Sequence, residues 1–304
     1  MLRRTFLYLS SSRSLRHWME NSSISRRLTS RFIAGRTLEE GIQVVKRLDG
    51  EHILSTLDFL GENVTSLAEA AHSKNSYLQA LEEIERAALP ATVSIKLTQF
   101  GLDFSEQACC DNVVPLVECA RRMNSRVEID MESSDYTDRT LNVVTSLHDR
   151  FPGHIRAVIQ AYLYRSEADI KMLSAKGIPV RLCKGAYSEP STVAFPNKAD
   201  VDANYVALMK LLLTQGIYPA IASHDEKIVR EGLRFIEEQK IASDRFEFQM
   251  LYGIRRDLQR ELVARNFRLR LYVPYGDAWY PYFMRRLAER PANVLFLARN
   301  LLRN

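Results

Sequence analysis

The sequence predicts a distorted (βα)8 barrel of the mixed α/β class, and three observations support that prediction. Eight short β-rich runs follow one another from residue 94 towards the end of the chain. The intervals between them carry helical patterns, and this alternation is typical of parallel βαβ units. Eight such units are enough to close a barrel. The expected strands lie at 94–98, 127–131, 157–163, 178–183, 218–224, 246–251, 267–273 and 292–298.

Two of the intervals show the helical pattern clearly. Residues 225–240 place Ile228, Leu233 and Ile236 on one apolar stripe with charged residues opposite. Residues 201–216 form a second such segment. The eighth unit ends so close to residue 304 that its own closing helix is expected to be short or absent.

The segment before these units looks helical. Thr37 and Glu40 have the spacing of a capping box, which opens a helix that Gly50 can end. Residues 65–88 carry a second amphipathic pattern. We therefore expect residues 1–90 to form an N-terminal helical arm, packed on a catalytic barrel of residues 91–304 as one structural unit.

The basic charge of the chain is confined to one end. The 304 residues have a net charge of +5, but residues 1–36 alone hold eight arginines and one acidic residue, Glu20, for a net +7. The rest of the chain is therefore slightly acidic, at −2. This distribution and the absence of a nucleic-acid-binding motif argue against a nucleic-acid partner.

The N-terminal residues bear on localisation. No apolar run of 18 or more residues could span a membrane, and serine and arginine interrupt the apolar stretch that a secretory signal needs. The Arg-rich, Ser-rich composition resembles a mitochondrial transit peptide, whereas Leu2, Phe6, Leu9 and Leu15 among arginines fit an interfacial helix. We expect a cytoplasmic protein with peripheral contact to the inner face of the cytoplasmic membrane; the mitochondrial matrix side is the alternative.

Two kinds of site are absent from the sequence. The four cysteines form no C-x-x-C and no zinc spacing, and no H-E-x-x-H is present, so we expect no metal. No two glycines are separated by a single residue, which excludes G-x-G-x-x-G, and the P-loop pattern is also missing. A bound nucleotide or flavin would need another mode of recognition.

The expected strands end in polar residues. Active sites of such barrels gather at the C-terminal ends of the strands. The alternative interpretation is that these side chains only pair with one another inside the barrel. Each buried charge needs a partner or a ligand, and so many polar strand ends together favour a binding site. The residues in question are Lys96, Asp130, Glu132, Gln160, Arg181, Lys184, Ser223, His224, Asp225, Glu247, Gln249 and Tyr272.

The segment 272–291 adds a second group. Tyr282, Arg285, Arg286 and Glu289 are spaced i, i+3, i+4 and i+7 and share one face of a short helix. Paired arginines beside a tyrosine can clamp a small carboxylate. A solvated helix surface is the alternative, but the aromatic residues just upstream favour a pocket.

Six motifs, in order, resemble those of proline dehydrogenase, most of all its short monofunctional bacterial form, and together with the strand order the resemblance covers about residues 30–300. They are Ser-Ile-Lys-Leu-Thr (94–98), Val-Glu-Ile-Asp-Met-Glu (127–132), Val-Arg-Leu-Cys-Lys-Gly-Ala-Tyr (180–187), Ala-Ser-His-Asp (222–225), Phe-Glu-Phe-Gln-Met-Leu-Tyr-Gly (246–253) and Tyr-x-x-Arg-Arg-x-x-Glu (282–289).

The resemblance implies a barrel that holds FAD, with its last helix over the barrel mouth. It implies oxidation of L-proline to Δ1-pyrroline-5-carboxylate, the first step of proline catabolism to glutamate, with electrons passed to a membrane quinone. It also implies that Lys96, Arg285 and Arg286 bind the substrate carboxylate, supported by Asp130. Tyr187, Leu251, Tyr272 and Tyr282 would wall the proline ring. The residues implied to bind FAD are Gln160, Arg181, Lys184, Gly185, Ala186, Ser223, His224 and Glu289.

Three alternatives stay open at this point. A hydroxyproline dehydrogenase of the same family would share these motifs. A barrel lyase or aldolase could use Lys96 or Lys184 as a Schiff-base amine. A non-enzymatic protein could bind a membrane surface or nucleic acid through its basic arm.

Overall fold

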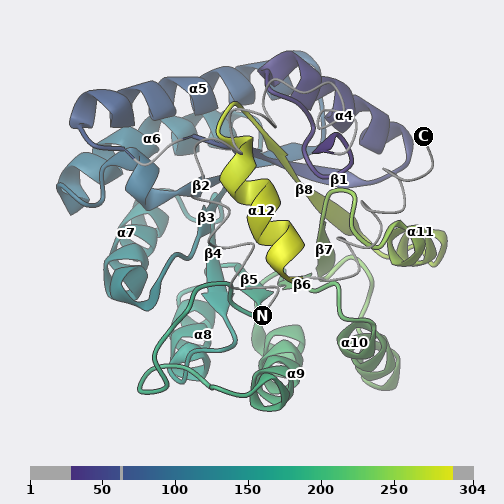
Figure 1. Ribbon diagram of the computed structural model, residues 1–304. Helices are drawn as coiled ribbons and strands as arrows, with labels where there is room; N and C mark the ends of the chain where they lie inside the picture. The colour runs from purple at the N-terminus through teal and green to yellow at the C-terminus, as the bar shows by residue number, and fades with distance from the viewer. Residues whose placement is uncertain (1–28, 62–63, 290–304) are drawn as a thin grey trace.

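Eight parallel strands close into a barrel in the order in which they occur along the chain (Figure 1). The computed structural model describes residues 29–61 and 64–289, and the side chains of the last helix as far as Met284. The predicted (βα)8 fold is confirmed. The strands are β1 (Leu54–Phe59), β2 (Ala91–Lys96), β3 (Val127–Asp130), β4 (Ile155–Gln160), β5 (Val180–Cys183), β6 (Ala220–Ala222), β7 (Glu247–Leu251) and β8 (Leu269–Tyr275).

Strand β1 corrects the expectation of an entirely helical segment before residue 91. It pairs with β2 on one side and with β8 on the other, from Leu54 opposite Arg270 to Phe59 opposite Tyr275, and so closes the barrel. Its alternate residues Thr56 and Asp58 are polar, so the segment lacks the apolar run by which the other strands were found. The barrel therefore begins at Leu54. The run expected as the first strand belongs to β2, and each later run is likewise one place further along in the barrel order. The strand expected at 292–298 lies outside the described residues.

The helices lie around the barrel and follow the expected patterns. The capping box is present: Glu40 N donates to Thr37 Oγ1 at 3.3 Å, and Thr37 N donates to Glu40 Oε2 at 3.2 Å. Ile228, Leu233 and Ile236 are buried as predicted. The helices are α4 (Leu38–Gly50), α5 (Leu67–Arg86), α6 (Glu106–Arg122), α7 (Thr137–Arg150), α8 (Ser166–Ala175), α9 (Lys198–Gln215), α10 (Glu226–Glu238), α11 (Arg256–Ala264) and α12 (Trp279–Glu289), with 3₁₀ turns at Leu97–Phe100 and Ser134–Tyr136.

The two faces of the strands differ in chemistry. Leu57, Val93 and Ile129 belong to the apolar core between strands and helices. The residues that alternate with them, such as Thr92 and Glu128, bond to one another through their side chains across neighbouring strands. The interior of the barrel is therefore filled with polar and charged side chains, which is why so many strands end in polar residues.

Ion pairs stabilise the buried interior. Arg156 Nη1 lies 3.2 Å from Glu128 Oε1 and 2.6 Å from Glu247 Oε1, and Arg270 Nε lies 2.9 Å from the same Glu247 oxygen. Burial alone would raise the pKa of Glu128, but Arg181, Arg156 and Arg270 together lower it to about 2. These carboxylates are thus charged at neutral pH.

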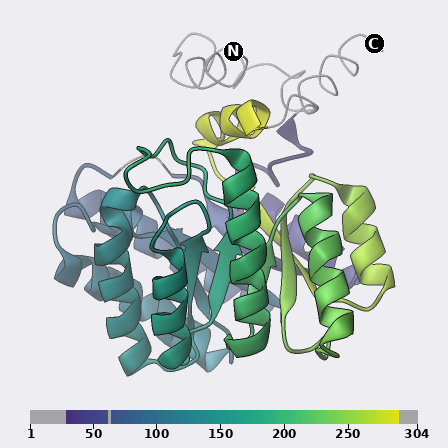
Figure 2. The same ribbon diagram turned by 90° about the horizontal axis from the view of Figure 1, so that it is seen from below.

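Helix α12 crosses the mouth of the barrel (Figures 1 and 2). Only three residues separate it from the end of β8, and Gly276 makes the turn with φ of +123°, where a Cβ atom would lie 2.8 Å from Leu60 O. The helix is held by an apolar cluster distinct from the main core. The buried members of that cluster are Phe32, Ile33, Leu60, Ile254, Trp279, Tyr280, Tyr282, Phe283 and Met284.

No helix within the described ranges is long and apolar enough to cross a membrane.

Candidate active site

Lys96 lies at the C-terminal end of β2, below helix α12. Its Nζ is 3.0 Å from Asp58 Oδ1, 3.7 Å from Asp130 Oδ2 and 3.3 Å from the Tyr272 hydroxyl. Burial lowers the pKa of Lys96, but the charges of Asp58 and Asp130 outweigh burial, so that pKa is raised above its ordinary value. Lys96 is therefore a fixed positive charge at neutral and moderately alkaline pH.

Asp130, at the end of β3, connects this lysine to two other strands. Its Oδ2 accepts a hydrogen bond from the Tyr272 hydroxyl at 2.8 Å. Its Oδ1 accepts hydrogen bonds from Arg181 Nη1 at 2.6 Å and from Ser94 Oγ at 2.8 Å. Burial and the Asp130 charge raise the pKa of Tyr272 well above its ordinary value, so the tyrosine stays neutral and donates. The structure thus brings Lys96, Asp130 and Tyr272 together as expected.

Arg181 lies inside β5 and is held from two sides. Beyond its bond to Asp130, its Nη2 donates to Glu128 Oε2, and its guanidinium stacks on the Tyr272 ring at 5.6 Å. Its Nε is buried and has no hydrogen-bond partner among the described residues. A buried donor without a partner is costly, which suits a position next to a ligand.

The residues after β4 and β5 extend the site along one side of the mouth. Gln160 Nε2 donates to the carbonyl of Glu132 at 2.7 Å. Lys184 Nζ lies 2.8 Å from Asp225 Oδ2 and also contacts Asp202, and Lys198 contacts the same two carboxylates, so two lysines and two acids balance one another. Gly185 has φ of +110°, and a Cβ atom there would lie 2.3 Å from the Tyr162 ring. Ala186, which follows it, is exposed.

The turn after β6 faces the end of β7. Leu251 N donates to His224 Nε2 at 2.7 Å, so that nitrogen is an acceptor. Ser223 Oγ accepts a hydrogen bond from Asp225 N at 3.1 Å. The bond from Leu251 N places the imidazole beside Leu251, one of the residues expected to contact the substrate.

Four residues of helix α12 are expected at the site, and the structure describes the side chain of one of them, Tyr282. Tyr282 is 6% exposed and belongs to the cluster that holds α12, against which Leu251 also packs. Arg285, Arg286 and Glu289 lie further along the same helix, and their side chains lie outside the described residues. Tyr187 is 41% exposed and lies on the loop after β5.

Asp58 is the residue that the sequence interpretation missed. It is 1% exposed, and Lys96 and the hydroxyl of Tyr77 both contact its Oδ1, at 3.0 and 3.3 Å. The missing strand β1 explains the omission. The alternation of Thr56 and Asp58 with Leu57 and Phe59 matches that of Ser94 and Lys96 in β2 and could have revealed it.

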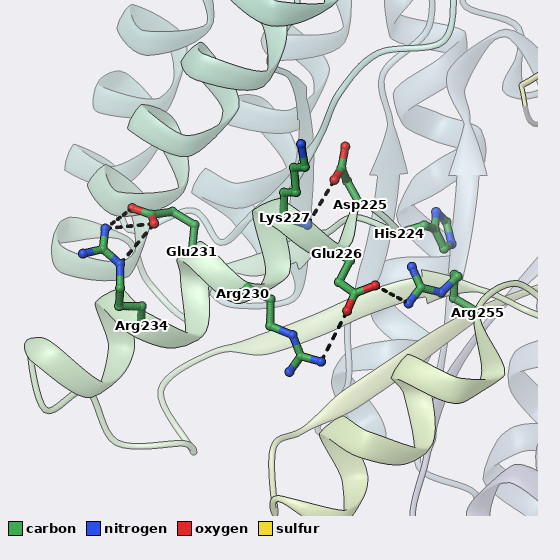
Figure 3. A pocket seen from close by; sticks show the side chains of 8 residues that line it. All are labelled: His224, Asp225, Glu226, Lys227, Arg230, Glu231, Arg234 and Arg255. Atoms are coloured by element: carbon green, nitrogen blue, oxygen red, sulfur yellow. Dashed lines mark hydrogen bonds and ion pairs between the residues drawn. The ribbon is translucent and has the colours of Figure 1, made fainter.

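An open hollow of about 830 Å³ lies beside the mouth and is a different feature (Figure 3). Most of its charges are paired: Glu226 lies 2.9 Å from Arg255 and 3.5 Å from Arg230, and Glu231 lies 2.8 Å from Arg234. Only His224 and Asp225 belong to the strand-end residues. Among the described residues, no set of charged side chains meets at one point of the hollow as the side chains around Asp130 do.

The part of the chain that the structure describes holds no cluster of three or more His, Cys, Asp or Glu residues that could bind a metal ion.

A closed (βα)8 barrel with converging charged side chains at the C-terminal ends of its strands has the architecture of a barrel enzyme. Comparison with known proteins identifies the enzyme family. A family model described as proline dehydrogenase matches residues 42–299. The chain therefore belongs to the proline dehydrogenase family, whose members are oxidoreductases.

Individual relatives agree with this assignment. Proline dehydrogenase 1 of Bacillus subtilis (strain 168) is 39% identical over 303 residues, which cover 100% of both chains. Proline dehydrogenase of Deinococcus radiodurans is 40% identical over 280 residues, 91% of this chain and 90% of the relative. A crystal structure of proline utilization A from Bdellovibrio bacteriovorus, inactivated by N-propargylglycine, superimposes with a TM-score of 0.81 at 29% identity. That match covers 86% of this chain and 32% of the larger protein.

Proposed function

We propose that this protein is an FAD-dependent L-proline dehydrogenase that forms Δ1-pyrroline-5-carboxylate, the first step of proline catabolism to glutamate. The observation that carries the proposal is the network in which Lys96, Asp130, Tyr272 and Arg181 converge at the mouth of the barrel, in a chain of this family. The network offers fixed positive charge and neutral hydrogen-bond donors, which suit an amino-acid substrate.

The substrate carboxylate would bind to Lys96 together with Arg285 and Arg286 of α12. A carboxylate in a half-buried site needs compensating cations, and Lys96 is held in its charged form. Asp130 would position the lysine and Tyr272. Leu251, Tyr272 and Tyr282 would wall the apolar part of the ring, with Tyr187 closing from its exposed loop.

The residues proposed to hold FAD suit that group. A flavin dinucleotide combines a hydrogen-bonding ring with a pyrophosphate, and the arc from β4 to β6 offers both kinds of partner. The buried Nε of Arg181, without a partner among the described side chains, is a donor suited to the ring. We assign Lys184 to the pyrophosphate side of the group, where a bound phosphate would compete with Asp202 and Asp225 for its ammonium group. The remaining residues of the proposed set are Gln160, Gly185, Ala186, Ser223, His224 and Glu289.

The reaction removes a hydride from the ring carbon next to nitrogen and a proton from nitrogen, and forms a C=N bond. A bound flavin supplies the two-electron acceptor for that hydride. The protein residues orient the ring and exclude water. Lys96 and Tyr272 hold their protons, so neither is a general base. We propose that the amine loses its proton before or during binding.

The same contacts disfavour the lyase alternative. A Schiff-base lysine must present a neutral amine. Lys96 is held protonated between two carboxylates, and Lys184 is bound by Asp202 and Asp225. Borohydride reduction in the presence of a carbonyl substrate should therefore leave both lysines unmodified.

An anaerobic titration tests the proposed function. The purified protein should be yellow, and L-proline should bleach its flavin absorbance in the absence of oxygen. Hydroxyproline, in a parallel titration, should bleach it more weakly; the reverse order would favour the hydroxyproline alternative. A colourless protein that does not take up added FAD would contradict the proposal.

We further propose that a membrane quinone accepts the electrons and that the basic residues 1–36 contact anionic lipid. The support is the net +7 of this segment beside a slightly acidic remainder. The protein would then be cytoplasmic and peripheral on the membrane. Co-sedimentation with anionic liposomes should be lost when residues 1–36 are removed; equal binding by both forms would contradict a role for the segment.

A further inference from the structure

Asp58 is buried directly beneath the proposed carboxylate site. Its Oδ1 accepts a hydrogen bond from Lys96 Nζ at 3.0 Å, and the Tyr77 hydroxyl oxygen lies 3.3 Å from the same atom. Tyr77, from α5, is itself fixed because its hydroxyl donates to Ser94 O at 3.0 Å and accepts from Phe59 N at 3.1 Å. The other oxygen of Asp58, Oδ2, is buried and has no hydrogen-bond partner within the described residues. Lys96 is also the only cation that Asp58 contacts among those residues.

We propose that Asp58 is a positioning residue of the substrate site, which holds the ammonium group of Lys96 in place and charged so that it can bind the carboxylate of proline. The inference rests on the proposed role of Lys96. Asp130 cannot take over this task alone. It lies 3.7 Å from Lys96 Nζ, and its oxygens already accept hydrogen bonds from Tyr272, Arg181 and Ser94.

The surroundings of Lys96 predict what a neutral residue at position 58 would do. Among the described residues, Asp58 from β1, Asp130 from β3 and Tyr272 from β8 face the lysine. Glu132 lies just beyond the end of β3, and Arg181 from β5 contacts Asp130. Without Asp58, Lys96 would lose its closest carboxylate and should release its proton at a lower pH. At neutral pH it would still be charged, and the site would hold one negative charge fewer. A purely structural defect would instead weaken binding at every pH.

The test uses cyclopentanecarboxylate, a five-membered ring with a carboxylate and no amine, so that the ligand itself does not titrate between pH 7 and pH 10. Calorimetry measures its Kd for the holoenzyme of the wild type, Asp58→Asn and Thr56→Val. Thr56 is the matched control because it is a buried residue of the same strand whose hydroxyl has no partner among the described residues.

We expect Asp58→Asn to bind the probe at least as tightly as the wild type at pH 7. Between pH 7 and pH 10 its Kd should rise at least about tenfold more than that of the wild type, the loss expected when one charge-assisted hydrogen bond disappears. Thr56→Val should follow the wild type. The proposal is overturned if Asp58→Asn follows the wild type at all pH values, or if it is weakened by the same factor throughout.

Lys96→Met separates this inference from the proposed function. If this variant binds the probe as tightly as the wild type, the role of Lys96 fails, and that of Asp58 fails with it. If Lys96→Met weakens binding while Asp58→Asn follows the wild type, only the role of Asp58 is overturned. Asp58→Ser, a smaller residue that also removes the charge, is measured in parallel and gives the same test if the asparagine variant does not fold.

Discussion

The hydroxyl of Tyr272, on β8, donates a hydrogen bond of 2.8 Å to Asp130 Oδ2, on β3. These strands are not neighbours in the barrel, so the bond runs across its interior. The same hydroxyl lies 3.3 Å from Lys96 Nζ, and the ring stacks on Arg181. One tyrosine thus contacts the carboxylate of Asp130 and the cations of Lys96 and Arg181.

Tyr272→Phe removes only the hydroxyl and should impair proline oxidation. Asp130 loses a donor and Lys96 a polar neighbour, whereas the stacking on Arg181 is kept. A hydrogen bond to a charged group contributes about 1.5–3 kcal/mol, so kcat/KM for L-proline should fall by about tenfold or more. Steady-state kinetics measure the effect. Tyr275→Phe is the control, because Tyr275 lies on the same strand but packs on Phe59; equal losses in both variants would contradict the role of Tyr272.

The sequence predicted most of this network, for a physical reason. Strand residues alternate between two faces, so a polar residue at the end of an otherwise apolar strand, such as Lys96 or Asp130, points into the barrel. In β1 the same alternation is weaker, because Ser55 stands opposite the apolar Ala91 of β2, and the pattern therefore predicts a helical arm around Asp58. Recognising its bond to Lys96 needs the register of the closed barrel, which no local pattern contains.

Contacts between loops were also beyond the sequence. The bond from Leu251 N to His224 Nε2 and the two carboxylates that bind Lys184 depend on how the turns after β5, β6 and β7 lie relative to one another. The motifs predicted that these residues share a face of the barrel. They did not predict that the charge of Lys184 is already balanced within the protein.

Breaking one of the buried ion pairs below the site should be strongly destabilising. Glu128→Gln would leave Arg156 and Arg181 with one carboxylate fewer in a dry interior, and breaking such a pair costs about 3–5 kcal/mol. The unfolding free energy from chemical denaturation should fall by about that amount. Glu261→Gln is the matched control, since it breaks an ion pair with Arg230 at the surface and should change stability little. Similar losses in both variants would contradict the prediction.

The stability of the protein should fall in acid because the carboxylate of Glu128 becomes protonated. The folded-state pKa of Glu128 is about 2, below its ordinary value of 4.5. Its contribution is therefore complete above about pH 4.5 and is lost as the pH falls from there towards 2. Denaturation curves at pH 7, 5 and 3 should show a decline only in the last step, and a smaller decline for Glu128→Gln. An equally steep decline in the variant would assign acid sensitivity to other groups.

The last prediction concerns helix α12. Arg286 follows Tyr282 by one helical turn, and Tyr282 is buried in the cluster that holds α12 on the barrel. If Arg286 binds the substrate carboxylate, Arg286→Met should weaken proline binding by about 1.5–3 kcal/mol, because one charge-assisted contact is removed. KM and kcat/KM for L-proline measure this directly. Arg234→Met, on the exposed side of α10, is the control for loss of a surface charge and should leave both constants unchanged. Unchanged constants for Arg286→Met would exclude that arginine from the site and leave Lys96 and Arg285 as the cations proposed for the carboxylate.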